Sequence, residues 1–229
     1  MHDEHHFESP ALVKDIVIGM ADGLTVPFAL AAGLSGAVDS NNIIITAGVA
    51  EIIAGSIAMG LGGYLAGKTD SDHFDSELKR EYDEVENLPE KEKAEIREIL
   101  SEYGITAATQ QKVADELAND KTHWVNFMMK FELGLVKPDK LRARKSAANI
   151  AVSYIVGGMI PLSAYLFTNN PNDGLIYSSV ITLLALLAFG FFKARVTGQS
   201  PLVGATRTAV IGALAAAAAF GIAKAVQCN

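Results

Sequence analysis

Long apolar runs alternate with a single long charged stretch along this chain. Five runs are almost free of charged residues, and each is long enough to cross a bilayer, which takes about 20 helical residues. They cover approximately Leu12–Gly36, Ile43–Gly67, Ala147–Phe167, Leu175–Phe192 and Leu202–Val226. A soluble helical core is the alternative, but five such runs have too few polar faces for one. The pattern therefore predicts five transmembrane helices.

The charged stretch between the second and third runs is also predicted to be helical. One helix is expected to continue the second span over Asp70–Glu86, and others to cover Pro89–Tyr103, Ala107–Asn119 and Lys121–Leu133. Proline is tolerated in the first turn of a helix, and glycine commonly ends one. The expected fold is all-α. Residues 1–67 hold the first two spans, 68–145 form a helical metal-binding domain, and 146–229 hold the last three spans.

The composition excludes several classes of function. The mean hydropathy of +0.24 over 229 residues fits two solvents, lipid and water, better than one globular core. A net charge of -7 argues against nucleic acid as a partner. The one cysteine, Cys228, offers neither a disulfide framework nor a thiolate metal site. The sequence shows no phosphate loop and no paired nucleophile and base, so neither an ATP-driven pump nor a hydrolase is expected.

Basic residues indicate the orientation in the membrane. All of the 19 lysines and arginines except Lys224 fall at the N-terminus, in residues 68–145, or around the connection between the last two spans. Loops rich in lysine and arginine stay in the cytosol. The N-terminus and residues 68–145 are therefore predicted to be cytosolic, with the C-terminus in the opposite compartment.

Three acids fall within the predicted spans: Asp15, Asp22 and Glu51. A carboxylate in hydrocarbon is costly, at least ~2.5–3.5 kcal/mol, and normally faces a pathway or a partner. Asp22 and Met59 are expected at similar depth in the membrane. A carboxylate oxygen together with a thioether sulfur suits a first-row transition metal ion. We expect Asp15, Asp22, Glu51 and Met59 to line a translocation path. Alternatively, Asp15 is interfacial and Asp22 caps a helix broken near Pro27.

The charged stretch carries glutamates at helical spacing. Residues three or four apart share a helix face, and facing carboxylate rows are how helical bundles build metal sites. A solvated helix with ion pairs such as Arg80–Glu84 and Lys91–Glu95 is the alternative. A lone His123 is more often surface, and the role of His2, His5 and His6 stays open. The predicted metal ligands are Glu81, Glu84, Glu92, Glu95, Met128, Met129 and Glu132.

Three segments of the spans resemble the vacuolar iron transporter family. These are the run from Asp22 to Leu34, the segment from Ala50 to Gly60, and the segment from Gly157 to Leu162. The glutamate-rich insert resembles that of the plant-type members. The resemblance implies a homodimer in the vacuolar membrane that exchanges cytosolic ferrous iron for protons, without a prosthetic group, through residues matching Asp22, Glu51 and Met59. It also implies that residues matching the seven predicted ligands gather the metal, with zinc, cobalt and manganese as further candidate ions.

Two other function classes compete with transport. A membrane-bound metal sensor or buffer needs only the glutamates of the charged stretch, so intramembrane Asp22 and Glu51 argue against it. A membrane di-iron enzyme usually has histidines near its carboxylates, and the predicted spans contain none. A secondary transporter, not an enzyme, is the expected function. Carboxylates bind metal only when deprotonated, so protons and metal would compete for the same sites.

Overall fold

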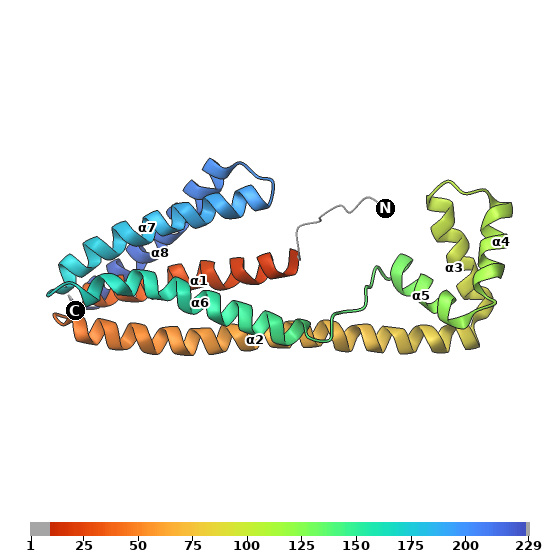
Figure 1. Cartoon of the computed structure of the whole chain (residues 1–229), viewed down its shortest axis with the longest axis horizontal. Coiled ribbons are helices and arrows are strands. Elements are labelled where there is room, and N and C mark those ends of the chain that lie inside the picture. The colour runs from red at the N-terminus through yellow and green to blue at the C-terminus, as the bar shows by residue number, and fades with distance from the viewer. Residues whose placement is uncertain (1–9, 228–229) are drawn as a thin grey trace. The chain divides into compact units, whose positions relative to one another are not determined.

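The computed structural model describes residues 10–227, and this part of the chain is helical without a strand (Figure 1). His2, His5, His6 and Cys228 lie outside the described residues. The all-α expectation is confirmed for this range. The helices are α1 Pro10–Ser35, α2 Asn41–Asn87, α3 Pro89–Glu102, α4 Ala107–Leu117, α5 Lys121–Phe131, α6 Arg142–Leu166, α7 Pro171–Val196 and α8 Pro201–Gln227.

Five of these helices, α1, α2, α6, α7 and α8, are long and apolar enough to span a membrane, as predicted. Large apolar side chains on them point outward. Ile57 is 66% exposed, Leu202 73% and Leu214 65%. Such surfaces favour lipid over water as the surrounding solvent. The second span and the expected extension over residues 70–86 form one helix, α2, of 47 residues.

The described residues form two compact units. The first combines the described parts of Met1–Leu65 and Ala143–Asn229, and the second is Ala66–Arg142. We call them the membrane unit and the glutamate unit. Because α2 runs through the boundary, its first part belongs to the membrane unit and its last part to the glutamate unit.

Small residues bring the helices of the membrane unit into close contact. A side chain at Gly23 would collide with the backbone of Tyr154, and one at Gly157 would lie 3.0 Å from the backbone of Gly23. Glycines at such crossings are the usual means of packing helices in lipid. The helices α1 and α6 therefore touch backbone to backbone beside Asp22.

The glutamate unit has its own apolar core. Its fully buried members include Ile96 on α3, Ala114 on α4, and Val125 on α5, with Phe74 of α2 beside them. Pro89 occupies the first turn of α3, and Asp120 caps α5 by accepting hydrogen bonds from the backbone N–H groups of Thr122 and His123. The helices so defined, α2, α3, α4 and α5, share this one core.

Candidate metal centres

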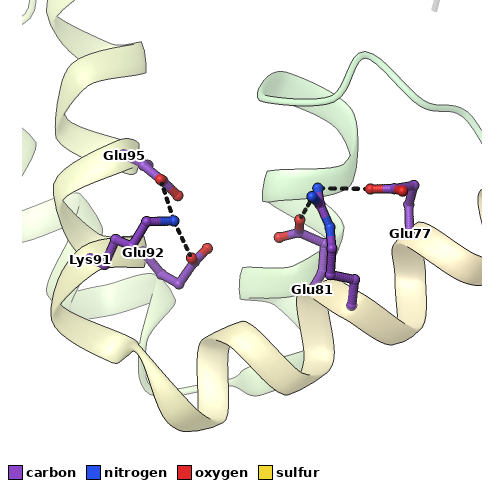
Figure 2. Close-up of polar contacts among 6 residues, drawn as sticks. Glu77, Glu81, Lys91, Glu92 and Glu95 are labelled. Carbon is purple, nitrogen blue, oxygen red and sulfur yellow. Dashed lines mark ion pairs between the residues drawn. The ribbon is translucent and has the colours of Figure 1, made fainter.

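Three carboxylates from three helices meet in the glutamate unit. Glu81 comes from α2, Glu92 from the first turn of α3, and Glu132 from the C-terminal cap of α5. One carboxylate oxygen of each lies within 4.8 Å of those of the other two. We call these residues the glutamate triad. Figure 2 shows Glu81 and Glu92 facing one another across the bend between α2 and α3.

Two of the three triad residues, Glu81 and Glu92, are buried with only long ion pairs to compensate their charges, whereas Glu132 is exposed. Glu81 and Glu92 are completely buried, and none of their four carboxylate oxygens has a hydrogen-bond partner among the described residues. The nearest cations stand beyond hydrogen-bond distance, with Arg80 3.6 Å from Glu81 and Lys91 3.8 Å from Glu92. Buried carboxylates without partners are strongly unfavourable unless they are protonated or bind a cation. The geometry and chemistry of the triad suit a divalent metal ion.

The surroundings hold protons on the triad more tightly than usual. Burial, followed by repulsion from Glu132 and Glu84, raises the pKa of Glu81 to about 7. Burial and repulsion from Glu95 and Glu81 likewise raise the pKa of Glu92 to about 7. Burial also raises the pKa of Glu132. A bound cation would offset this repulsion, because the opposite charge favours the ionised carboxylates.

The other predicted ligands have different surroundings. Glu95 forms a 3.0 Å ion pair with Lys91, one of the two pairs expected from a solvated face. Arg80 pairs with Glu77 at 2.7 Å. Glu84 is half-buried, and its charge contributes to the raised pKa values of the triad. Arg80 and Lys91 therefore lie closer to Glu77 and Glu95 than to the triad residues Glu81 and Glu92.

Both predicted methionine ligands lie in the apolar core. Met128 is completely buried, Met129 is 2% exposed, and both pack with Trp124 and Val125. The carbonyl of Met128 accepts a 2.9 Å hydrogen bond from the N–H of Glu132, so the two residues are one helical turn apart. Both methionines therefore pack in the core beside the triad, and their role as metal ligands stays a prediction. His123 is exposed and its Nδ1 lies 3.0 Å from Asp120.

In the membrane unit, Glu51 of α2 is joined to Tyr154 of α6. The tyrosine hydroxyl donates a hydrogen bond to Oε1 of Glu51, while Oε2 is buried without a partner among the described residues. Gly55 lies one turn after Glu51 and leaves room for the tyrosine ring, since a side chain there would collide with the hydroxyl. Tyr154 is not among the residues predicted from the sequence, because a tyrosine in an apolar helix gives no sign of its contacts.

Asp22 of α1 is half-buried, and no hydrogen bond or ion pair engages its side chain within residues 10–227. Its neighbour Gly23 packs on the backbone of Tyr154. Pro27 has no N–H, so the carbonyl of Gly23 lacks its helical donor. Met59 on α2 is also half-buried. An unpaired acid beside a freed carbonyl in a membrane-spanning helix is a candidate cation site.

Asp15 differs from Asp22. It is 1% exposed, and it accepts hydrogen bonds from the hydroxyl of Ser146 at 3.0 Å and from the amide of Asn149 at 3.3 Å. These contacts join the beginning of α1 to the beginning of α6. A carboxylate so engaged stabilises the helix pair and has less capacity left for a passing ion.

Comparison with known proteins agrees with the resemblance. The profile of the VIT family matches residues 13–224. The chain is 53% identical to "Vacuolar iron transporter 1" of Tulipa gesneriana over 99% of this chain and 92% of that protein. It is 53% identical to "Vacuolar iron transporter 1" of Arabidopsis thaliana over 99% of this chain and 90% of that protein. "Protein CCC1" of Saccharomyces cerevisiae is 36% identical over 94% of this chain and 69% of the yeast protein.

Proposed function

Since the chain belongs to the VIT family, we propose that it carries ferrous iron from the cytosol into the vacuole in exchange for protons. The observation that carries this proposal is Asp22, a half-buried carboxylate in a membrane-spanning helix with no hydrogen-bond or ion-pair partner among residues 10–227. The glutamate triad alone would serve a sensor or buffer equally well. An acid inside the span is explained by movement of a cation through it.

In this proposal the glutamate unit gathers the ion. The triad supplies three carboxylates, with Glu84 and Glu95 on its rim as further oxygen ligands within the same unit. Oxygen ligands do not select iron strictly, so zinc, cobalt and manganese are candidate cargoes too. The methionines Met128 and Met129 fix the core behind Glu132.

The path through the membrane unit uses Asp22, Met59 and Glu51. The carboxylate of Asp22 and the thioether of Met59 offer one oxygen and one sulfur, and Glu51 receives the ion with an oriented carboxylate. Tyr154 positions that carboxylate by its hydrogen bond. Asp15 stays a candidate residue of the path, and its hydrogen bonds to Ser146 and Asn149 hold its carboxylate between α1 and α6.

Proton exchange follows from the chemistry of the ligands. Carboxylates must lose their protons before they bind metal, so metal and protons exclude one another at the same oxygens. At cytosolic pH the ionised acids take the cation, and an acidic vacuole returns protons to them and releases it. The cycle needs no nucleotide and no prosthetic group.

We propose a homodimer, with the path between the first and second spans of two subunits. Five spans form a modest bundle for a complete path, and a second copy doubles the number of carboxylates along it. The excess of lysine and arginine favours a cytosolic glutamate unit and a C-terminus in the vacuole.

The decisive experiment is metal flux into sealed vesicles. Proteoliposomes containing the full chain, with an acidic interior, should accumulate ferrous iron and lose internal protons together. Uptake without any change of internal pH would leave a transporter but remove the antiport mechanism. Metal binding without uptake would leave the sensor or buffer function.

A further inference from the structure

A second polar site lies between the end of α7 and the beginning of α8, far in sequence from every acid discussed above. Here a pocket of about 410 Å³ is lined by Lys193, Thr197, Ser200, Val203 and Arg207. The two helices touch at its inner end, since a side chain at Gly190 would collide with the carbonyl of Gly204. The pocket is therefore formed by the packing of α7 on α8.

The charge of this pocket is uncompensated. No aspartate or glutamate follows Asp173 in the sequence, so α8 has no acid and α7 only Asp173 in its first turn. Neither Lys193 nor Arg207 forms an ion pair within residues 10–227. On α1, which packs on both helices, Asp15 is buried and engaged by α6. Two cations thus share one pocket, and no carboxylate within residues 10–227 pairs with either of them.

The remaining donors of the pocket suit an oxyanion. Lysine and arginine together offer eight N–H groups and no acceptor. The first turn of α8 adds backbone N–H groups that have no helical partner, including that of Val203 on the pocket wall. The N-terminus of a helix favours negative charge. A phosphate group matches this set of donors.

The rim of the pocket is apolar. Phe192 is 63% exposed, Leu202 73% and Val203 64%, and Ile211 on the wall is 54% exposed. A free anion would gain nothing from such a rim, whereas the acyl chains of a lipid would cover it. Both helices are long and apolar enough to span the membrane, so the exposed apolar side chains of this rim are suited to contact with lipid. The surroundings favour a membrane lipid over a soluble phosphate.

We propose that this pocket binds the phosphate-bearing headgroup of an anionic membrane lipid, held by Lys193, Arg207 and the first turn of α8. Basic pockets between transmembrane helices recognise such headgroups by charge and by donor geometry. The bound lipid would fasten α7 to α8 at their polar ends. This site is separate from the metal path and goes beyond the transport function.

The test is lipid binding to the purified full chain, measured by native mass spectrometry in detergent. Phosphatidylserine and phosphatidylcholine with identical acyl chains are compared, together with water-soluble glycerophosphoserine and inorganic phosphate. The wild-type protein should retain phosphatidylserine in preference to phosphatidylcholine. In the Lys193→Gln/Arg207→Gln variant the affinity for phosphatidylserine should fall about thirtyfold, as expected for two charges near the membrane surface.

Two control variants make the test specific. Arg195→Gln removes a charge from the same end of α7 that does not line the pocket, and should keep the preference. Lys193→Arg/Arg207→Lys preserves both charges and should bind phosphatidylserine nearly as the wild type does. An equal loss in Arg195→Gln, no preference in the wild-type protein, or equal binding of the water-soluble headgroup would each overturn the proposal.

Discussion

The hydroxyl of Tyr154 on α6 donates a hydrogen bond to Oε1 of Glu51 on α2, whereas Oε2 of the same carboxylate is buried and has no hydrogen-bond partner in the described part of the chain. One oxygen is fixed in position and the other is free to accept a proton or a cation. This asymmetry orients the free oxygen without consuming it. Tyr154 is therefore a positioning residue in the proposed path.

Removing that hydroxyl should slow transport. In Tyr154→Phe the carboxylate of Glu51 loses the hydroxyl donor of Tyr154, and a hydrogen bond to a charged group contributes about 1.5–3 kcal/mol. We expect the initial rate of iron uptake into proteoliposomes to fall about tenfold or more, with a changed dependence on internal pH. Tyr64→Phe, on an exposed position of α2, is the matched control. Equal rates in both variants would show that Tyr154 only fills space.

Asp22 should be indispensable for uptake. Asp22→Asn keeps the size of the side chain and removes the charge, so the protein should fold while uptake stops at every metal concentration. Met59→Ala should reduce uptake and change the preference among iron, zinc, cobalt and manganese. Asp39→Asn, in the connection between α1 and α2, controls for the loss of one acid. Flux in Asp22→Asn close to that of the wild type would remove Asp22 from the path.

The glutamate triad should account for metal binding by the glutamate unit. Glu92→Gln removes one buried ligand. Even the replacement of a residue that only supports a metal ligand lowers the metal affinity about 10–100-fold. We expect calorimetry on the full chain to show at least about tenfold weaker binding of divalent cations. Glu90→Gln, exposed on the same turn of α3, should bind as the wild type does. Equal metal affinity of Glu92→Gln and wild type would favour the alternative that these glutamates form a solvated helix face with ion pairs and bind no metal.

Without metal, the glutamate unit should lose stability as pH rises. The pKa values of Glu81 and Glu92 rise from 4.5 to about 7 on folding, so the folded state binds more protons between these values. Stability then falls from about pH 4.5 to about pH 7 and stays low above it. The lowered pKa values of Asp115 and Asp120 change the stability at lower pH than this range.

The one tryptophan makes this measurable. Trp124 is buried in the core of the glutamate unit, so its fluorescence reports unfolding of that unit in the full chain. The midpoint of thermal unfolding should be lower at pH 8 than at pH 5.5 without metal, and divalent cations should raise it at pH 8. In Glu81→Gln/Glu92→Gln the difference between the two pH values should shrink. A metal-free midpoint independent of pH contradicts the prediction.

Collection of metal should matter most when metal is scarce. The glutamate unit is covalently attached to the second span through α2, and tethering raises the effective concentration of a bound ion. Glu92→Ala/Glu95→Ala should therefore reduce initial uptake rates at low metal and approach the wild type at high metal. A double variant as inactive as Asp22→Asn at saturating metal would mean that the glutamates belong to the gate.

The helices could be predicted closely because their limits have local causes. Span two and residues 70–86 contain no proline and no glycine after Gly67, and α2 indeed runs to Asn87. Pro89 and Gly104 set the ends of α3, and Gly104 adopts a φ of 72°, which glycine permits. Patterns that act within a few residues can be read from the sequence alone.

The contacts of the site were harder to predict, because they depend on packing between distant segments. Helical spacing singled out Glu81, Glu92 and Glu132 but gave Glu84 and Glu95 equal weight. Only the fold shows which of them are buried and which reach a lysine. The hydrogen bond between Glu51 and Tyr154 joins residues 103 positions apart. Neither the sequence around Glu51 nor that around Tyr154 indicates it.

The order of synthesis treats the two units differently. All residues of the glutamate unit lie in one uninterrupted segment, Ala66–Arg142, so the ribosome finishes this unit before the third span exists. The membrane unit instead packs Phe28 and Ala32 of α1 on Ala216 of α8. The helix α1 therefore cannot complete its packing until α8 has been synthesised. Domains generally fold as units while the chain emerges, so a nascent chain arrested before α8 would already hold a complete glutamate triad on an unfinished bundle.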